Sequence, residues 1–80
     1  MEELLNQSLL GLYRHFKGGI YRVTAIATHT ENDGKYVVYY KVDEPSQILV
    51  RPYDMFFSNI NKHVNPDATQ IERFKQIKEG

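Results

Sequence analysis

Three stretches of the chain are rich in β-branched, aliphatic and aromatic residues, and the first of them alternates between apolar and polar positions except at Ile26. This pattern predicts three β-strands, at residues 20–29, 35–42 and 47–51. The pair Asp33-Gly34 is a strong two-residue hairpin signal and joins the first two stretches. The second stretch is apolar on both parities, so we expect its strand to lie in the centre of the sheet. The three strands are therefore predicted to form an antiparallel meander.

Two short segments have helical patterns, and a third segment is ambiguous. Pro52 ends the third stretch and suits the first position of a helical turn at residues 52–57. Leucines at helical spacing near the start predict a helix or ordered tail at residues 1–10. Residues 70–78 fit either a helix or a strand, and we favour the strand because it would complete a small sheet.

Length and composition place these elements in one small domain. Eighty residues support one hydrophobic core, and six tyrosines and four phenylalanines are enough to fill it. We therefore expect a mainly β fold at residues 11–80, either a small SH3-like antiparallel barrel or a curved sheet. A chain this short has little room for a deep catalytic cleft, which makes an enzyme the less favoured class.

Charge and cysteine content exclude several further classes. Lysine plus arginine equals aspartate plus glutamate at 10 each, so a general polyanion binder of the histone type is not expected. No cysteine is present for a disulfide or a thiolate metal site. The apolar runs are too short to span a bilayer, and the acidic start does not resemble a secretory signal. We expect a cytoplasmic protein with no membrane contact.

Several short blocks occur in the order that is typical of one protein family. These blocks are Tyr13-Arg14-His15-Phe16-Lys17-Gly18-Gly19, Ala27-Thr28-His29-Thr30-Glu31, Val37-Val38-Tyr39, Val50-Arg51-Pro52 with Met55-Phe56, and Arg73-Phe74. The chain resembles the small bacterial family called domain of unknown function 1653 from Gly11 to about Ile77. Leu49 departs from the tryptophan that is usual in that family. The resemblance implies a compact, mostly β, cytoplasmic bacterial domain and no established activity.

A locally basic stretch is the first candidate for binding. The residues from Leu4 to Thr30 include cations and histidines but no acidic residue, and aromatic residues are interleaved with them. Single-stranded nucleic acid is bound in this way, because cations hold phosphates while bases stack on rings. The alternative is that the rings are core and the charges are merely solvated.

Arg51 is the second candidate, because it precedes a proline and so projects from an extended backbone at the end of a strand. Its guanidinium could bind a carboxylate or phosphate, or instead pair with Asp54. We expect a non-catalytic module that binds an anionic small molecule or a nucleic acid. Its predicted ligand-binding residues are Arg14, His15, Lys17, Tyr21, His29, Tyr39 and Arg51. The cations would hold negative charge, and Tyr21 or Tyr39 would supply a stacking surface.

Two other function classes remain open. A leucine stripe at the start of the chain, or the edge of the sheet, could join a protein partner or a second copy. A small enzyme would need His15 or His29 as its acid-base group, although no catalytic motif appears. The three histidines lack metal-ligand spacing, so we expect neither a metal site nor a cofactor.

Overall fold

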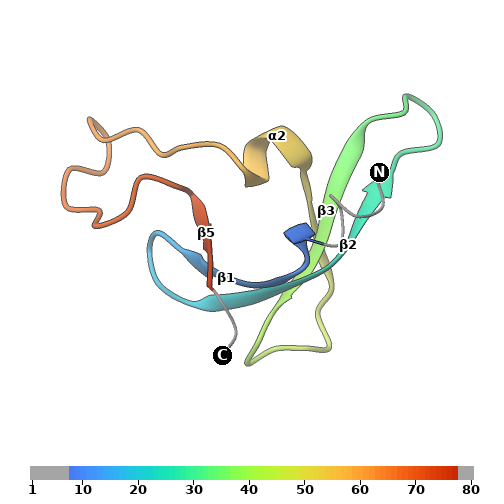
Figure 1. Ribbon diagram of the computed structural model, residues 1–80, viewed down its shortest axis with the longest axis horizontal. Coiled ribbons are helices and arrows are strands. Elements are labelled where there is room, and N and C mark those ends of the chain that lie inside the picture. The colour runs from blue at the N-terminus through green and yellow to red at the C-terminus, as the bar shows by residue number, and fades with distance from the viewer. Residues whose placement is uncertain (1–7, 78–80) are drawn as a thin grey trace.

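The computed structural model describes residues 8–77 and contains one antiparallel sheet and one short helix. Its elements in chain order are β1 (Gly11–His15), β2 (Ile20–Thr28), β3 (Lys35–Lys41), β4 (Leu49–Pro52), α2 (Tyr53–Phe56) and β5 (Phe74–Gln76). The sheet curls into a trough, and α2 lies across its open side (Figure 1). A long irregular segment then leads from α2 to β5 at the opposite edge of the sheet (Figure 1).

The strand order in the sheet is β4-β3-β2-β1-β5, and every neighbouring pair is antiparallel. The predicted meander of β2, β3 and β4 is confirmed, and β3 is an internal strand as expected. Residues 29–34 join β2 to β3, so the connection is longer than a two-residue hairpin turn. Asp33 has a positive φ of 57°, in the left-handed region, whereas Gly34 does not.

A β-bulge in β2 changes which of its side chains face the core. The pairing of β2 with β3 shifts between Val23 and Ala25, so that Val23 lies opposite Tyr39 while Ile26 lies opposite Val37. Because one extra residue reverses the parity, Ile26 joins Val23 on the core face and Ala25 turns outward. The bulge therefore accounts for the interruption of the alternation at Ile26.

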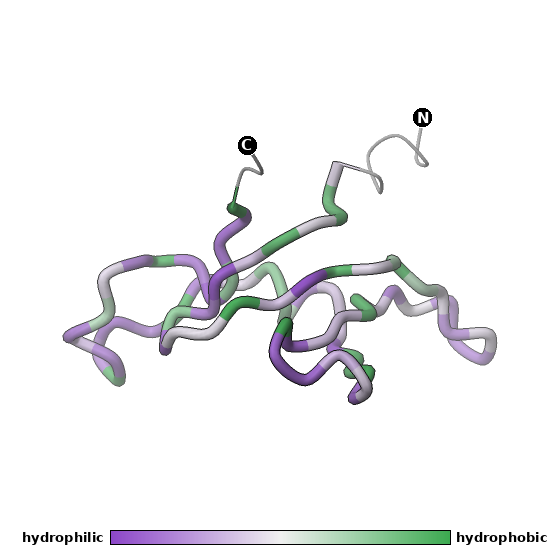
Figure 2. Tube along the Cα trace, turned by 90° about the horizontal axis from the view of Figure 1, so that it is seen from below, coloured by the Kyte–Doolittle hydropathy of each residue, from purple (hydrophilic) through white to green (hydrophobic). Residues whose placement is uncertain are grey.

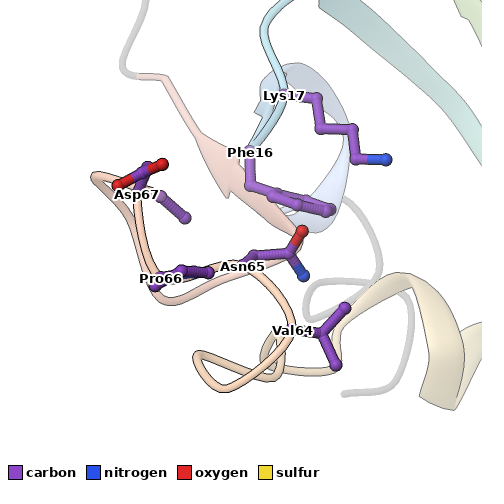
Figure 3. A pocket seen from close by; sticks show the side chains of 7 residues that line it. Phe16, Lys17, Val64, Asn65, Pro66 and Asp67 are labelled. Carbon is purple, nitrogen blue, oxygen red and sulfur yellow. The ribbon is translucent and has the colours of Figure 1, made fainter.

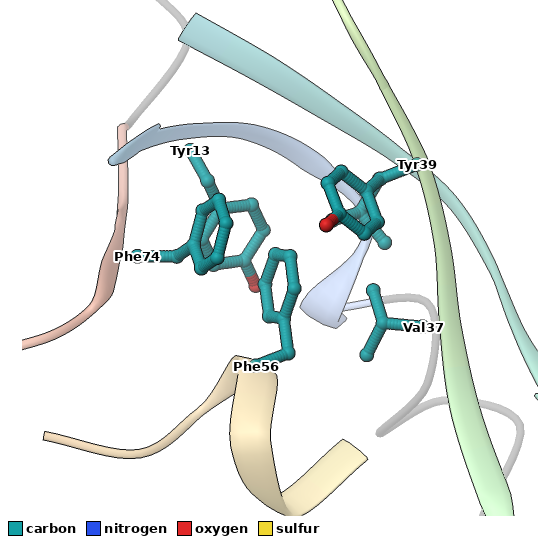
Figure 4. Packing of buried hydrophobic residues seen from close by; sticks show 6 residues of the cluster. Tyr13, Val37, Tyr39, Phe56 and Phe74 are labelled. Carbon is teal, nitrogen blue, oxygen red and sulfur yellow. The ribbon is translucent and has the colours of Figure 1, made fainter. Parts of the chain in front are cut away.

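The core is a cluster of aromatic rings between the sheet and α2 (Figure 4). Phe56 of α2 is fully buried and stacks on Phe74 of β5, with ring centroids 4.1 Å apart and planes 5° apart. Tyr13 and Tyr39 meet Phe56 edge-on at 5.3 and 5.2 Å. Such ring pairs contribute beyond their buried area, and here they attach the helix to three different strands.

The predicted mainly β fold is confirmed, but the sheet is not closed into a barrel, so the SH3-like barrel is not observed. The edge strands β4 and β5 do not pair with each other, and both are short. Pro52 ends β4 and is followed directly by α2, whose Phe56 fills the space between the edges. The helical turn expected at residues 52–57 is confirmed as α2.

Both ends of the described chain contribute strands. The sequence pattern failed to indicate β1, because the leucine spacing suggested a helix or tail that extends to this region. Residues 11–15 instead pair with β2 on one side and with β5 on the other. The helix expected at residues 1–10 is not seen, since residues 1–7 lie outside the described range. The strand favoured for residues 70–78 is confirmed over three residues.

Polar residues gather in the turns and loops that project from the sheet (Figure 2). Exposed large hydrophobic side chains are scattered over the described residues, and they include Ile48 and Val50 at β4 (58% and 63% exposed) and Val64 in the segment before β5 (72% exposed). Within residues 8–77, no helix has the length and apolar character that crossing a membrane requires.

We expect Phe56→Ala to lower the free energy of unfolding by about 3–5 kcal/mol, because it removes the ring that joins α2 to the sheet and leaves a cavity. Met55→Ala is the matched control, since the adjacent Met55 side chain is exposed and its loss should cost less than about 0.5 kcal/mol. Urea unfolding followed by circular dichroism measures both. Equal transition midpoints for the two variants would contradict this account of the core.

Candidate functional site

Four nitrogen-bearing side chains converge where β1 turns into β2. They are His15, Lys17, Arg51 and Arg73, and we call them the basic patch. His15 ends β1, and a tight turn returns the chain to β2 through hydrogen bonds from Gly18 N to His15 O (2.8 Å) and from His15 N to Gly19 O (3.1 Å). Both glycines have positive φ angles, of 100° and 88°, which other residues rarely adopt. The turn therefore fixes where His15 and Lys17 emerge.

Arg51 reaches the basic patch from the far edge of the sheet. Its backbone pairs with Val37, which is fully buried, so the Arg51 side chain lies on the core side of β4. Its Nε donates a hydrogen bond to the hydroxyl of Tyr39 at 3.3 Å, and its Cζ lies 5.7 Å from the Phe74 ring centroid. The guanidinium is thus held across the aromatic core with its remaining N–H groups available as donors.

Arg73 reaches the basic patch from the segment before β5. Its backbone is fixed by two hydrogen bonds: its carbonyl oxygen accepts from Phe16 N (3.0 Å), and its own N donates to Ser58 O (3.0 Å). Its Nε donates to Ser58 Oγ at 3.1 Å, and its Cζ lies 5.9 Å from the Phe16 ring centroid. Backbone and side chain together therefore place this cation beside the turn that follows β1.

His15 lies between the cations and the core. Its ring contacts Phe16 and Phe74 at centroid distances of 4.7 and 4.8 Å, and its Nδ1 accepts a hydrogen bond from Lys17 N at 3.1 Å. Burial lowers the pKa of His15, and the positive charges of Arg51, Arg73 and Lys17 lower it further. The neutral imidazole therefore carries its proton on Nε2, which leaves a donor for a ligand.

The positive charge of the basic patch is not neutralised by the described part of the chain. Arg51 and Arg73 donate their Nε hydrogen bonds to neutral hydroxyls, and each group that shifts the pKa of His15 electrostatically is a cation. Convergent cations without a carboxylate attract anions, and an anion among them would relieve their mutual repulsion. Among residues 8–77, no cluster of three or more metal-ligating side chains is found.

A pocket of about 310 Å³ adjoins the basic patch at Phe16 (Figure 3). The residues that line it are Phe16, Lys17, Val64, Asn65, Pro66, Asp67 and Ala68. The Phe16 ring projects toward the loop, with the Asn65 amide next to it in this view, whereas Asp67 lies at the far end (Figure 3). The pocket therefore has an aromatic wall on the side where the cations lie.

The structure brings together some of the predicted site residues. His15, Lys17 and Arg51 converge, and the Tyr21 ring lies 6.2 Å from that of His15. Tyr39 lies below them but is only 4% exposed, so it positions Arg51 through its hydroxyl and offers no stacking face. These residues come from four strands and one turn, which explains why they are distant in sequence.

Arg14 and His29 lie elsewhere. Arg14 follows the buried Tyr13 and precedes His15, so the alternation along β1 directs it to the opposite face of the sheet. His29 lies at the far end of the hairpin, where its Nδ1 accepts a hydrogen bond from Glu31 N and its ring contacts Tyr36. The alternative pairing of Arg51 with Asp54 is not observed, since Arg51 bonds to Tyr39 instead.

Two residues of the site were missing from the predicted set, Phe16 and Arg73. Both lie in the sequence blocks that carry the family resemblance, and membership of these blocks is the sequence feature that could have indicated them. The position of Arg73 could not be inferred, because it depends on the pairing of β5 with β1, in which His15 lies opposite Phe74 across 58 intervening residues.

Comparison with known proteins identifies a family but no characterised relative. No curated protein matches the sequence, and no solved structure matches the fold. The family model described as "Protein of unknown function (DUF1653)" matches residues 11–76, which include all five strands, α2 and every member of the basic patch. The chain therefore belongs to the DUF1653 family of proteins of unknown function.

Proposed function

We propose that this protein is a non-catalytic binding module that holds an anionic ligand at the basic patch. The observation that carries this proposal is the convergence of Arg51, Arg73 and Lys17 around His15 with no carboxylate bonded to either guanidinium among residues 8–77. Holding like charges close together costs free energy in the folded protein, and a bound anion recovers it.

The hydrogen-bonding capacity of the two arginines matches a phosphate or a carboxylate. Each guanidinium has five N–H donors in a planar fork, and the structure uses only the Nε donor of each for its hydroxyl partner. Arg51 and Arg73 are also oriented by the rings of Phe74 and Phe16. Because they are already held in place, they lose little conformational freedom when a ligand binds.

We expect Arg51→Gln and Arg73→Gln each to weaken the binding of inorganic pyrophosphate about tenfold, since each variant removes charge-assisted hydrogen bonds. Arg14→Gln is the matched control, because it removes the same charge from the opposite face of the sheet and should leave the affinity unchanged. NMR titration at low salt measures the affinities, and the dispersion of the amide spectrum shows that each variant is folded. Equal weakening by all three variants would show that pyrophosphate binding depends only on the net charge of the protein, and it would exclude this site.

The pKa of His15 reports on the same site. We expect NMR titration to place it below 6.5 in the free protein, because burial and three cations disfavour the imidazolium. Sulfate keeps its charge between about pH 5 and 8, the range over which histidine titrates. A bound sulfate stabilises the imidazolium and so raises the pKa of His15. By linkage, sulfate then binds more tightly as the pH falls through that pKa.

The resonances of His29, at the far end of the β2–β3 hairpin, serve as an internal control and should not move with sulfate. A His15 pKa that is the same with and without saturating sulfate would show that the anion binds away from the basic patch.

A further inference from the structure

We propose that the anion held at the basic patch is the phosphate of a nucleotide, and that the base of this nucleotide stacks on Phe16 in the adjoining pocket. This inference rests on the proposed function and names its ligand class. It follows from the position of Phe16, the cations around its ring and the lining of the pocket.

Phe16 is an aromatic residue without a role in the core. The buried cluster and the partly buried side chains packed against it do not include Phe16, although most of the surface of this residue is covered by other groups. Its neighbours are instead His15, Lys17 and Arg73, and it forms one wall of the pocket. A small domain gains most by burying its large side chains. A phenylalanine that is fixed at the surface beside cations is therefore better explained by a ligand than by stability.

Two cations lie over the ring of Phe16, close enough to reach the phosphate of a nucleotide whose base stacks on this ring. Lys17 Nζ and Arg73 Cζ are 5.7 and 5.9 Å from the centroid of the Phe16 ring. Proteins that bind nucleotides of a single strand combine an aromatic stacking surface with cations that contact the adjacent backbone. Lys17 is exposed and has a flexible side chain, so it can leave the ring for a phosphate when a base takes its place.

The opposite wall of the pocket suits the edge of a base. Val64 and Pro66 provide apolar contacts, and Asn65 provides an amide with both donor and acceptor groups. Its Nδ2 makes only a long bond of 3.4 Å to Asn61 O. Asp67 lies on the side of the pocket away from the Lys17 amino group, where its charge opposes a phosphate and so favours the orientation with the phosphate toward Lys17 (Figure 3).

The pocket is large enough for one base. Its volume of about 310 Å³ lies at the lower end of the range for small-molecule sites, and the pocket is open to solvent. Carboxylate ligands without a ring would leave this space and the face of Phe16 unused. The combination of one flat pocket with neighbouring cations is what favours a nucleotide over other anions.

The decisive experiment compares two labelled strands that carry the same number of phosphates. One is a uridine hexanucleotide, and the other is an abasic hexamer with no bases. We expect the wild-type protein to bind the uridine strand about tenfold more tightly at low salt, since base stacking adds to phosphate binding. Phe16→Leu should remove this preference and leave the affinity for the abasic strand unchanged. Tyr40→Leu is the matched control, because it removes a ring from the opposite face of the sheet, and it should retain the preference.

A second variant gives a readout that does not depend on affinity. The chain contains no tryptophan, so Phe16→Trp introduces a single indole at the stacking position. We expect the uridine strand to quench its fluorescence and the abasic strand to leave it unchanged. Quenching by both strands, or by neither, contradicts base stacking on residue 16.

The outcomes separate this inference from the proposed function. Equal affinity for the two strands, with pyrophosphate binding that depends on Arg51 and Arg73, would overturn the nucleotide and retain an anion site. No binding of either strand or of pyrophosphate would overturn both proposals.

A titration with uridine monophosphate distinguishes a free nucleotide from a nucleic-acid strand as the source of the ligand. Binding of the monophosphate as tight as that of the hexamer identifies a free nucleotide, and preference for the hexamer identifies a strand. Either result supports a site that binds a phosphate together with a stacked base.

Discussion

The stacking of Phe74 on Phe56 is the contact on which both the fold and the site depend. β5 has three residues and one neighbouring strand, so backbone pairing alone would hold it weakly. The stacked rings attach it to α2, and α2 in turn covers the trough of the sheet. The Phe74 ring also contacts the basic patch, because His15 meets the ring edge-on and the Arg51 guanidinium lies over it. One side chain therefore connects core packing with the placement of the basic patch.

Electrostatics explain how a chain with zero net charge can present a cationic surface. Acidic residues such as Glu31 and Asp33 lie in the hairpin turn at the far end of β2, where solvent screens them. The cations of the basic patch approach one another only because rings and hydroxyls orient them, through Tyr39 for Arg51 and Ser58 for Arg73. Net charge describes solubility and long-range attraction, whereas a binding site depends on this local arrangement.

The sequence indicates local structure well and long-range placement poorly. The β2–β3 hairpin and α2 were predictable, because Asp33-Gly34 and Pro52 impose their own backbone geometry. The bulge was visible only as Ile26 interrupting the alternation. Convergence of His15 with Arg51 was expected, but Arg14 was wrongly grouped with them, although neighbours on a strand face opposite sides. Arg73 could not be placed, since nothing in residues 70–78 specifies β1 as the partner strand.

Because the domain is small, the position of Phe16 outside the core is informative about function. An open sheet with one four-residue helix leaves limited apolar area for the core, so each large side chain that lies outside it has a cost in stability. Tyr13, Tyr39 and Phe74 are in the core, whereas Phe16 is not, and it is surrounded by groups that carry or accept positive charge. Selection for stability alone favours burying that ring or replacing it with a polar residue. The placement of Phe16 between the cations and an open pocket is therefore better explained by recognition than by folding.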